Sequence, residues 1–469
     1  MIFSFSMEDL TVNKGKKTRA GRLNNRGAIV HGLVLAAVVV AAAGLRIWWI
    51  HFCDTVPVYD FLKYHLGAVS LAQGNGYKLF GNYTAFEPIG LGAWLAGLYR
   101  VFGVDYFVPK VANVVLGTIS VGLIYLQGRR FFGPSAGLLA AVLLAFSPRN
   151  IIYTSVISTE VLFTFLFLLA LWVLTVRRES AGLYLLVGVL GAALAFVKPN
   201  LLVFPVLVFM VRGAMGLRTT GQWKASAVRS MKKAGLVALV MAVVIAPWTL
   251  RNYRVFGKFI PISTNGGITL FLNNNDYATG AWQDPFVLPD SPIAGMRNPE
   301  TGFWDEIKVD EIAGAAARQW IRENPGTFFR MGFTKNALVY RHARDVQFAI
   351  DYTSSGGPLT NRGWIYTWSH RVWRGFLGAM AFAGVVTLFN LLFKRRHLVE
   401  LWTLFVPWVM FSATFFVFEG QPRYVFPLLP LLILWVSWSI MFVLGRLSDH
   451  AQGSVRTNGR KPAKRASRG

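Results

Sequence analysis

About ten apolar segments, separated by short polar stretches, restrict the folds that this chain can adopt. Most of them are long enough to cross a hydrocarbon layer of about 30 Å as a helix. Lys and Arg side chains collect at alternate boundaries of the segments, which is typical of cytoplasmic loops. We therefore expect an all-α polytopic membrane protein with about ten transmembrane helices. The expected spans are residues 28–50, 107–127, 134–153, 158–176, 182–197, 201–211, 234–250, 372–393, 398–418 and 424–444.

The composition agrees with this class of protein. Hydrophobic residues make up 54% of the chain and charged residues only 15%, against about 25% in soluble domains. A net charge of +26 can indicate a nucleic-acid partner. Here the basic residues lie in the tails and in loops between apolar segments, so we expect no nucleic acid. Cys53 is the only cysteine, which excludes a disulfide framework and a cysteine metal cluster.

The distribution of charge also orients the chain. A basic stretch precedes the first span, which places the N-terminus in the cytoplasm. Counting crossings from there puts both termini inside and the two long polar stretches outside. We divide the chain into a basic cytoplasmic tail (1–27), an N-terminal transmembrane module (28–250) with a first outer loop (51–106), an extracytoplasmic region with interfacial helices (251–371), C-terminal transmembrane helices (372–445) and a second basic tail (446–469).

Several shorter stretches outside predict helices that lie at the membrane surface. Residues 59–73 have the pattern of an amphipathic helix, which Gly74-Asn75-Gly76 ends. Residues 88–103 are apolar but short for a full crossing. Two further helices are expected at 310–323 and 326–340.

Asp60 lies close to the point where the first span should leave the bilayer on the outer side. Asp60 and Tyr64 are four residues apart, so on a helix they share a face. Asp60 is a candidate general base that takes a proton from an acceptor hydroxyl. An acid in the first turn of a helix is also favoured by the helix dipole alone, and the residues by themselves leave both interpretations open. Asp54 is a competing base nearer to the span.

Glu87 and Arg423 are the next candidates. Glu87 precedes Pro88 at the start of an expected interfacial helix, where it would bind a metal ion or a sugar hydroxyl, or cap the helix. Arg423 lies in a short outer turn, where a guanidinium can bind a phosphate with two hydrogen bonds. Other basic residues at such boundaries usually reach lipid headgroups. They are Arg46, Lys198, Arg251, Arg254, Arg330, Lys335 and Arg341.

Taken together, these features resemble the GT-C class of integral-membrane glycosyltransferases, in particular the branch of protein O-mannosyltransferases and lipid A aminoarabinose transferases. The likeness depends on the order of short motifs across nearly the whole chain. The motifs are Asp60-x-x-x-Tyr64 with Gly74-Asn75-Gly76-Tyr77, Phe86-Glu87-Pro88-Ile89-Gly90, Ser158-Thr159-Glu160, Pro247-Trp248-Thr249-Leu250-Arg251-Asn252-Tyr253, Glu323-Asn324-Pro325-Gly326 and Arg423-Tyr424-x-x-Pro427-x-x-Pro430.

The resemblance implies an inverting sugar transfer from a polyprenyl-phosphate donor on the extracytoplasmic face, with Asp60 as the general base. Two departures matter. Phe61 follows Asp60 where many relatives have Glu, which weakens a scheme with two adjacent carboxylates. Glu87 stands where some relatives have Lys, so the role of binding the donor phosphate passes to other cations, for which we name Arg423 and Arg251.

We also expect Tyr59, Tyr64 and Glu87 to contact the sugar or the acceptor, which would be a protein, a lipid or a glycan. The implied enzyme is a hexosyl- or pentosyltransferase of the bacterial plasma membrane. No cofactor is required by the motifs, and whether Glu87 holds a divalent cation stays open.

Two alternative functions are a lipid-linked sugar flippase or transporter and a non-enzymatic assembly protein that binds cell-envelope glycans. Transporters gather polar residues at the membrane midplane, whereas the spans here hold few.

Overall fold

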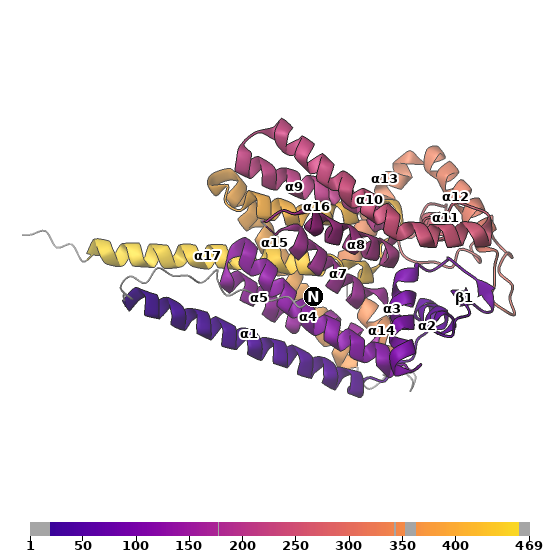
Figure 1. Cartoon of the computed structure of the whole chain (residues 1–469), viewed down its shortest axis with the longest axis horizontal. Helices are drawn as coiled ribbons and strands as arrows, with labels where there is room; N and C mark the ends of the chain where they lie inside the picture. The colour runs from indigo at the N-terminus through magenta and orange to yellow at the C-terminus, as the bar shows by residue number, and fades with distance from the viewer. Residues whose placement is uncertain (1–18, 177, 342–343, 352–362, 459–469) are drawn as a thin grey trace, which may run out of the picture.

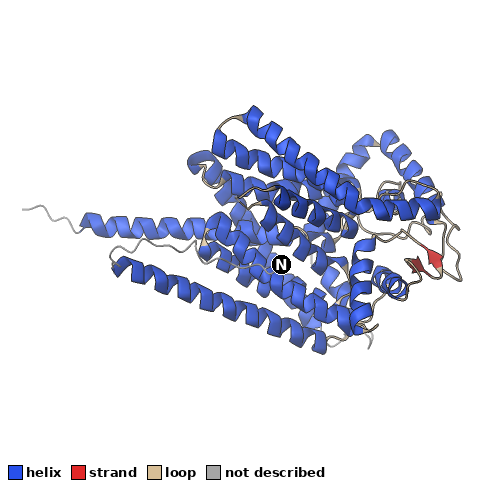
Figure 2. Cartoon of the chain, viewed as in Figure 1, coloured by secondary structure: helices blue, strands red, loops and turns tan. Residues whose placement is uncertain are grey.

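The computed structural model describes residues 19–176, 178–341, 344–351 and 363–458, and helices dominate it (Figure 1, Figure 2). Two short strands form an antiparallel hairpin, β1 (Lys78–Leu79) and β2 (Asn82–Tyr83). The α-helices are α1 (Arg19–Phe52), α2 (Tyr59–Ala72), α3 (Ile89–Phe102), α4 (Phe107–Phe132), α5 (Pro134–Ala145), α6 (Pro148–Ile152), α7 (Thr159–Leu174), α8 (Ala181–Val197), α9 (Phe204–Thr220), α10 (Trp223–Phe256), α11 (Gly266–Phe271), α12 (Glu306–Glu323), α13 (Pro325–Arg341), α14 (Arg344–Asp351), α15 (Gly363–Phe389), α16 (Leu398–Val417) and α17 (Leu429–Asn458).

Seven of the described helical segments are long and apolar enough to cross a membrane, and the bent pair α5–α6 makes an eighth if it counts as one span. Helices α7 and α8 are also apolar but shorter, with 16 and 17 residues. The chain is thus an all-α, multi-pass membrane protein, as predicted, and about ten spans is compatible with it. The seven segments are Ile29–Phe52, Phe107–Phe132, Pro199–Thr220, Trp223–Phe256, Gly363–Lys394, Leu398–Val417 and Leu429–Leu447.

The span expected at 134–153 is broken in the middle. Helix α5 meets the segment that follows at an angle of 57°, and Pro148 opens α6, where a missing N–H disrupts no helical hydrogen bond. The buried guanidinium of Arg46 lies against this break and donates hydrogen bonds to the carbonyl oxygens of Ala145 (3.3 Å) and Ala42 (3.0 Å). Arg46 therefore satisfies carbonyl groups inside the bundle and does not reach a lipid headgroup.

The core of the bundle lies where α4 packs against α5 and α7, and α7 against α8. Phe163 and Phe167 of α7 are almost completely buried there. Outer helices instead expose large apolar side chains, for example Val243 of α10 (65% exposed) and Val385 of α15 (68% exposed). Exposed apolar side chains on long helices of this kind are suited to contact with lipid or protein.

Short elements build one end of the molecule, where α2, α3, α11 and α12 gather (Figure 1). Helices α2 and α3 occupy the stretches expected at 59–73 and 88–103, and α13 covers the one expected at 326–340. Helix α12 begins at Glu306, earlier than predicted, because the Asp305 side chain caps it by accepting hydrogen bonds from two backbone N–H groups. The β1–β2 hairpin was not predicted.

Both chain ends extend their helices further than the sequence suggested. Helix α1 begins inside the expected tail 1–27, and α17 continues to Asn458, inside the expected tail 446–469. Residues 1–18 and 459–469 of these tails lie outside the described residues. The start of α1 and the end of α17 lie at the same end of the molecule, opposite α2 and α12 (Figure 1).

Candidate functional site

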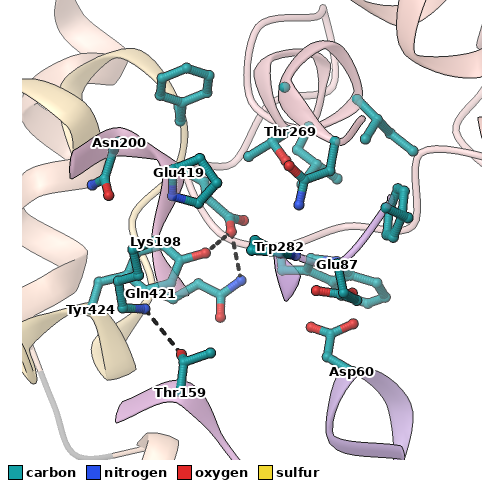
Figure 3. Close-up of a pocket in the computed structure, with 18 of the residues that line it drawn as sticks. Asp60, Glu87, Thr159, Lys198, Asn200, Thr269, Trp282, Glu419, Gln421 and Tyr424 are labelled. Carbon is teal, nitrogen blue, oxygen red and sulfur yellow. Dashed lines mark hydrogen bonds between the residues drawn. The ribbon is translucent and has the colours of Figure 1, made fainter. Parts of the chain in front are cut away.

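A cavity of about 530 Å³ lies among α2, the residues before α3, the starts of α7 and α11, the end of α8 and the turn between α16 and α17. Its volume is in the range of about 300–1,000 Å³ that small-molecule sites occupy. Of the predicted site residues, four line this cavity, whereas Arg251 and Tyr59 do not. The polar lining residues include Asp60, Lys63, Tyr64, Glu87, Thr159, Glu160, Lys198, Asn200, Glu419, Gln421, Arg423 and Tyr424 (Figure 3).

Asp60 stands in the first turn of α2, on the cavity side. Its Oδ1 accepts a hydrogen bond from Lys63 Nζ at 3.2 Å, and its Oδ2 accepts one from Arg423 Nη2 at 3.4 Å. Burial raises the pKa of Asp60, but the charges of Lys63 and Arg423 outweigh it and hold this pKa below its ordinary value. Asp60 is therefore ionised at neutral pH, and its side chain is 40% exposed, so that a ligand can reach it.

Glu87 also lines the cavity, and its carboxyl group lies near that of Asp60 (Figure 3). Glu87 is 5% exposed, and the Tyr64 hydroxyl is a hydrogen-bond partner of its carboxyl group. Burial, with the nearby charge of Asp60, raises the pKa of Glu87 to about 7. The two carboxyl groups thus have different protonation behaviour in one site, which is common where acid–base chemistry occurs.

Lys63 lies between these two carboxylates. Its Nζ is 3.2 Å from Asp60 Oδ1 and 3.7 Å from Glu87 Oε1. The rings of Phe86 and Trp304 also hold the ammonium group, at 5.1 and 5.6 Å from their centroids. Burial lowers the pKa of Lys63, but the two carboxylates raise it more, so its pKa lies above the ordinary value and Lys63 stays a cation.

The turn after α16 carries Arg423 into the cavity. Glu419 in this turn accepts hydrogen bonds from Gln421 Nε2 at 3.0 Å and from the Tyr424 hydroxyl (Figure 3). Gly420 packs against the backbone of Lys335, where a β-carbon would overlap the Lys335 carbonyl group. The turn is therefore rigidly placed, and it presents a guanidinium beside Asp60.

A third cation, Lys198, enters the cavity from the end of α8. Its Nζ donates a hydrogen bond to Thr159 Oγ1 at 3.3 Å and lies 3.9 Å from Glu160 Oε1 (Figure 3). Burial lowers the pKa of Lys198, which Glu160 partly offsets. Asn200 follows it, with a buried Oδ1 that has no hydrogen-bond partner in the described structure. Lys198 and Asn200 thus offer polar groups to a ligand at this edge.

The structure places Arg251, a predicted ligand of the donor phosphate, outside the cavity. Its guanidinium donates hydrogen bonds to the carbonyl oxygens of Thr84 and Tyr77, both at 3.0 Å, and lies over the Trp248 ring, 4.7 Å from its centroid. It does not line the cavity. Arg251 instead ties α10 to the β1–β2 hairpin.

Two more predicted residues lie elsewhere. Tyr59 is 65% exposed and packs beside Phe348 of α14, with ring centroids 6.2 Å apart. Asp54, the competing base, pairs with Lys110 at 3.0 Å and is not among the cavity residues. Of the acids between α1 and α3, Asp60 and Glu87 line the cavity and Asp54 does not.

Among the residues that the structure describes, no group of three or more His, Cys, Asp or Glu side chains is arranged to hold a metal ion. Glu87, the candidate ligand, has the cation Lys63 as its neighbour instead. A divalent cation therefore has no built site of this kind in the described part of the chain.

Sequence reasoning missed Lys63, Glu419 and Trp304 as cavity residues. Lys63 carried a usable signal, because it is three residues after Asp60 and such pairs meet on a helix. Glu419 carried one as well, because it lies four residues before Arg423 in the same short turn, whereas Trp304 carried none, since its place depends on contacts between distant segments.

Comparisons with known proteins agree with this architecture. Residues 87–250 match the family model described as dolichyl-phosphate-mannose-protein mannosyltransferase. No curated protein sequence matches the chain. The crystal structure of the oligosaccharyltransferase from Archaeoglobus fulgidus in the apo form is similar over 92% of this chain, with 13% identity and a TM-score of 0.51. The match covers 53% of that protein, so this chain spans about half of its length.

Two further solved structures are similar at lower scores. The Archaeoglobus fulgidus oligosaccharyltransferase AglB in complex with an inhibitory peptide and a dolichol-phosphate has a TM-score of 0.49 at 13% identity, covering 93% of this chain and 52% of that one. ArnT from Cupriavidus metallidurans bound to undecaprenyl phosphate has a TM-score of 0.42 at 14% identity, covering 88% and 78%. The chain thus has the fold of the GT-C class of integral-membrane glycosyltransferases, and its residues 87–250 are similar to the dolichyl-phosphate-mannose-protein mannosyltransferase family.

Proposed function

We propose that this protein transfers a sugar from a polyprenyl-phosphate donor to an acceptor hydroxyl, with inversion at the anomeric carbon. The observation that carries the proposal is the meeting of Asp60 with Arg423 in one cavity that Lys198 also lines. A proton acceptor beside cations that bind phosphate is what such a transfer requires. The family match at residues 87–250, whose description names a dolichyl-phosphate sugar donor, supports this donor class.

Asp60 acts as the general base in this mechanism. Its carboxylate accepts the proton of the acceptor hydroxyl while that oxygen attacks the anomeric carbon of the donor sugar. The bond between the anomeric carbon and the phosphate oxygen breaks, and its electron pair leaves with the phosphate. A single in-line displacement inverts the anomeric centre.

Arg423 and Lys198 bind the donor phosphate. Both side chains line the cavity, and Arg423 presents a planar guanidinium that can contact two phosphate oxygens. Negative charge grows on the leaving phosphate as the bond breaks, so fixed cations stabilise the transition state more than the bound donor. Arg251, whose guanidinium is taken up by backbone carbonyls, has no part in this step.

The polyprenyl tail leaves the cavity between α9 and α16. A small apolar notch lies there, lined by Phe167, Leu201, Leu207, Pro407 and Met410 among others. The notch shares Asn200, Phe411 and Thr414 with the main cavity, so the two adjoin. Beside it, Val203 and Val206 expose 50% and 51% of their surface on the outside of the bundle. At about 20 Å³ the notch itself is too small for an isoprenoid unit, so side chains there have to move apart as the tail passes along this apolar surface toward the lipid.

The cavity lies on the extracytoplasmic side in this proposal. Arg129 and Arg130 lie in the last turn of α4, and Lys394, Arg395 and Arg396 lie at the end of the π-helical turn that continues α15. The positive-inside rule favours a cytoplasmic position for these basic helix ends. Odd-numbered crossings then carry the chain to the outer face, where α2 begins.

The test is an assay of the purified full-length protein with short-chain prenyl-phosphate sugars and a set of protein, lipid and glycan acceptors. We expect sugar to appear on an acceptor and prenyl phosphate to be released in equal amount. Movement of intact donor across a vesicle membrane, with no cleavage of the sugar–phosphate bond in any acceptor mixture, would show a transporter and overturn the proposal.

A further inference from the structure

The carboxyl groups of Asp60 and Glu87 point toward one another in the cavity and share Lys63 as a neighbour (Figure 3). We propose that they work as a pair, in which Glu87 takes over and holds the acceptor's proton while Asp60 returns to the ionised form. This inference rests on the proposed sugar transfer and assigns to Glu87 a role that goes beyond it.

The charges around the two groups are unequal. Asp60 has two cations within hydrogen-bonding reach, Lys63 at 3.2 Å and Arg423 at 3.4 Å. Among the described residues, Glu87 has one ion-pair partner, Lys63 at 3.7 Å, with Arg423 acting on it more weakly, and it is 5% exposed. Cations favour the ionised form of a carboxyl group, and burial favours its neutral form. A proton that enters the pair is therefore more stable on Glu87 than on Asp60.

The difference in proton affinity between Glu87 and Asp60 matters for the proton that the reaction releases. The acceptor oxygen loses its proton to Asp60 Oδ as the new glycosidic bond forms, and the neutral Asp60 then faces Glu87. Transfer of that proton to Glu87 leaves a carboxylate beside Arg423 and a neutral acid in the buried position. Glu87 later releases the proton to water, and no other reactant is needed.

Lys63 is the positioning residue of the pair. Because the Phe86 and Trp304 rings and both carboxylates hold its ammonium group, Lys63 remains a cation throughout and keeps the two acids side by side. Without this charge, two facing carboxylates would repel each other.

The pKa directions of the groups agree with this geometry. The groups that face Glu87 are Asp60, Lys63 and Tyr64 of α2, Tyr77 near the hairpin and Arg423 of the turn. Burial and the Asp60 charge raise the pKa of Glu87 to about 7, whereas the pKa of Asp60 is below its ordinary value because Lys63 and Arg423 outweigh the effect of burial. The two carboxyl groups titrate as a coupled pair. The directions of the two pKa shifts therefore indicate that the first proton taken up by the pair resides on Glu87.

Infrared difference spectroscopy of the full-length protein between about pH 5 and pH 9 tests the pair without any turnover. We expect a protonated-carboxyl band that titrates near neutral pH, is absent in Glu87→Gln and moves to lower pH in Asp60→Asn, because the neighbouring negative charge is gone. Glu300→Gln, at an exposed site, should leave the band unchanged. An unaltered band in Glu87→Gln overturns the inference, whether or not the protein transfers sugar.

The pH profile of transfer is the second measurement. In the unmodified protein, kcat/KM should fall as pH drops through about 7, because a protonated Glu87 cannot receive the proton. Glu87→Gln should lower kcat by about 10- to 100-fold and abolish the fall of kcat/KM at acidic pH. Glu87→Asp should restore part of the rate and of this pH dependence. If kcat/KM of Glu87→Gln still falls at acidic pH as in the unmodified protein, the inference is wrong. A protein with no transfer activity on any donor contradicts the proposed function instead.

Discussion

The Nη2 atom of Arg423 lies 3.4 Å from Oδ2 of Asp60, although 363 positions separate the two residues. The contact joins the start of α2 to the turn between α16 and α17. The contact also links donor binding to proton removal in the proposed reaction. While Arg423 is paired with Asp60, its positive charge makes the Asp60 carboxylate a weaker base. A donor phosphate that takes over the guanidinium would remove this restraint, so that Asp60 gains basicity when the donor is bound.

Asp60→Asn tests the base directly. The amide is nearly the same size as the carboxylate but accepts no proton, so we expect at least about a hundredfold loss of transfer with normal membrane insertion. Asp54→Asn is the matched control, since Asp54 lies on the same loop, pairs with Lys110 and does not line the cavity. Full activity of Asp60→Asn would remove Asp60 from the mechanism.

Arg423→Ala tests the phosphate contact. We expect a loss of about a hundredfold in kcat/KM for the donor, as for removal of one charge-stabilising group, and a smaller loss in Arg423→Lys, which keeps the charge but not the planar fork. Steady-state kinetics with varied donor concentration measure both. Arg254→Ala, at an exposed position on α10, serves as the control. A donor dependence in Arg423→Ala that matches this control would contradict the assignment.

Met410→Trp tests the path of the polyprenyl tail. The larger ring should fill the notch between α9 and α16, and we expect the KM for a long-chain donor to rise about tenfold, or about 1.4 kcal/mol. Donors with very short prenyl chains should be used normally, because they do not reach the notch. Val409→Trp is the control, since Val409 is 58% exposed on the outer surface. Equal losses for long and short donors would place the tail elsewhere.

Much of the fold could be predicted because its signals are local. The period of apolar residues places α2 and α3 within about a residue or two of their observed bounds. The break between α5 and α6 was missed although Ser147-Pro148 marks it, because the apolar character of the segment runs on through the bend. Hydropathy alone reports whether a segment is buried in lipid, and it does not report whether the helix is continuous.

The site was predicted only in part, for a related reason. Asp60, Glu87 and Arg423 sit next to turns whose residues are recognisable in the sequence, and all three line the cavity. The environment of Arg251 could not be foreseen, because its partners are backbone carbonyl groups 167 and 174 positions away. A cation at the end of a span looks the same in sequence whether it binds a ligand or the protein's own backbone.

Arg251→Ala should accordingly affect stability and not donor binding. Two backbone carbonyls would lose a charged donor, which costs about 1–3 kcal/mol. We expect a lower midpoint of thermal unfolding in detergent, together with an unchanged KM for the donor in the fraction that stays folded. A raised donor KM at full stability would return Arg251 to the phosphate site.

Gly420→Ala tests whether the outer turn must be held in place for Arg423 to act. The buried Lys335 of α13 donates hydrogen bonds to the Val417 carbonyl oxygen at 3.1 Å and to Asn274 Oδ1 at 3.2 Å, and the Gly420 N–H donates to the Gly280 carbonyl oxygen at 3.0 Å. A methyl group on Gly420 would overlap the Lys335 carbonyl group, so the turn has to move away from α13. Arg423 would then shift with the turn, and a displacement of about 1 Å can cost about a hundredfold in rate.

Gly378→Ala in α15 is the control, because a β-carbon there meets no atom within 4 Å. Transfer by Gly420→Ala at the rate of this control would show that the position of the turn is not needed for phosphate binding.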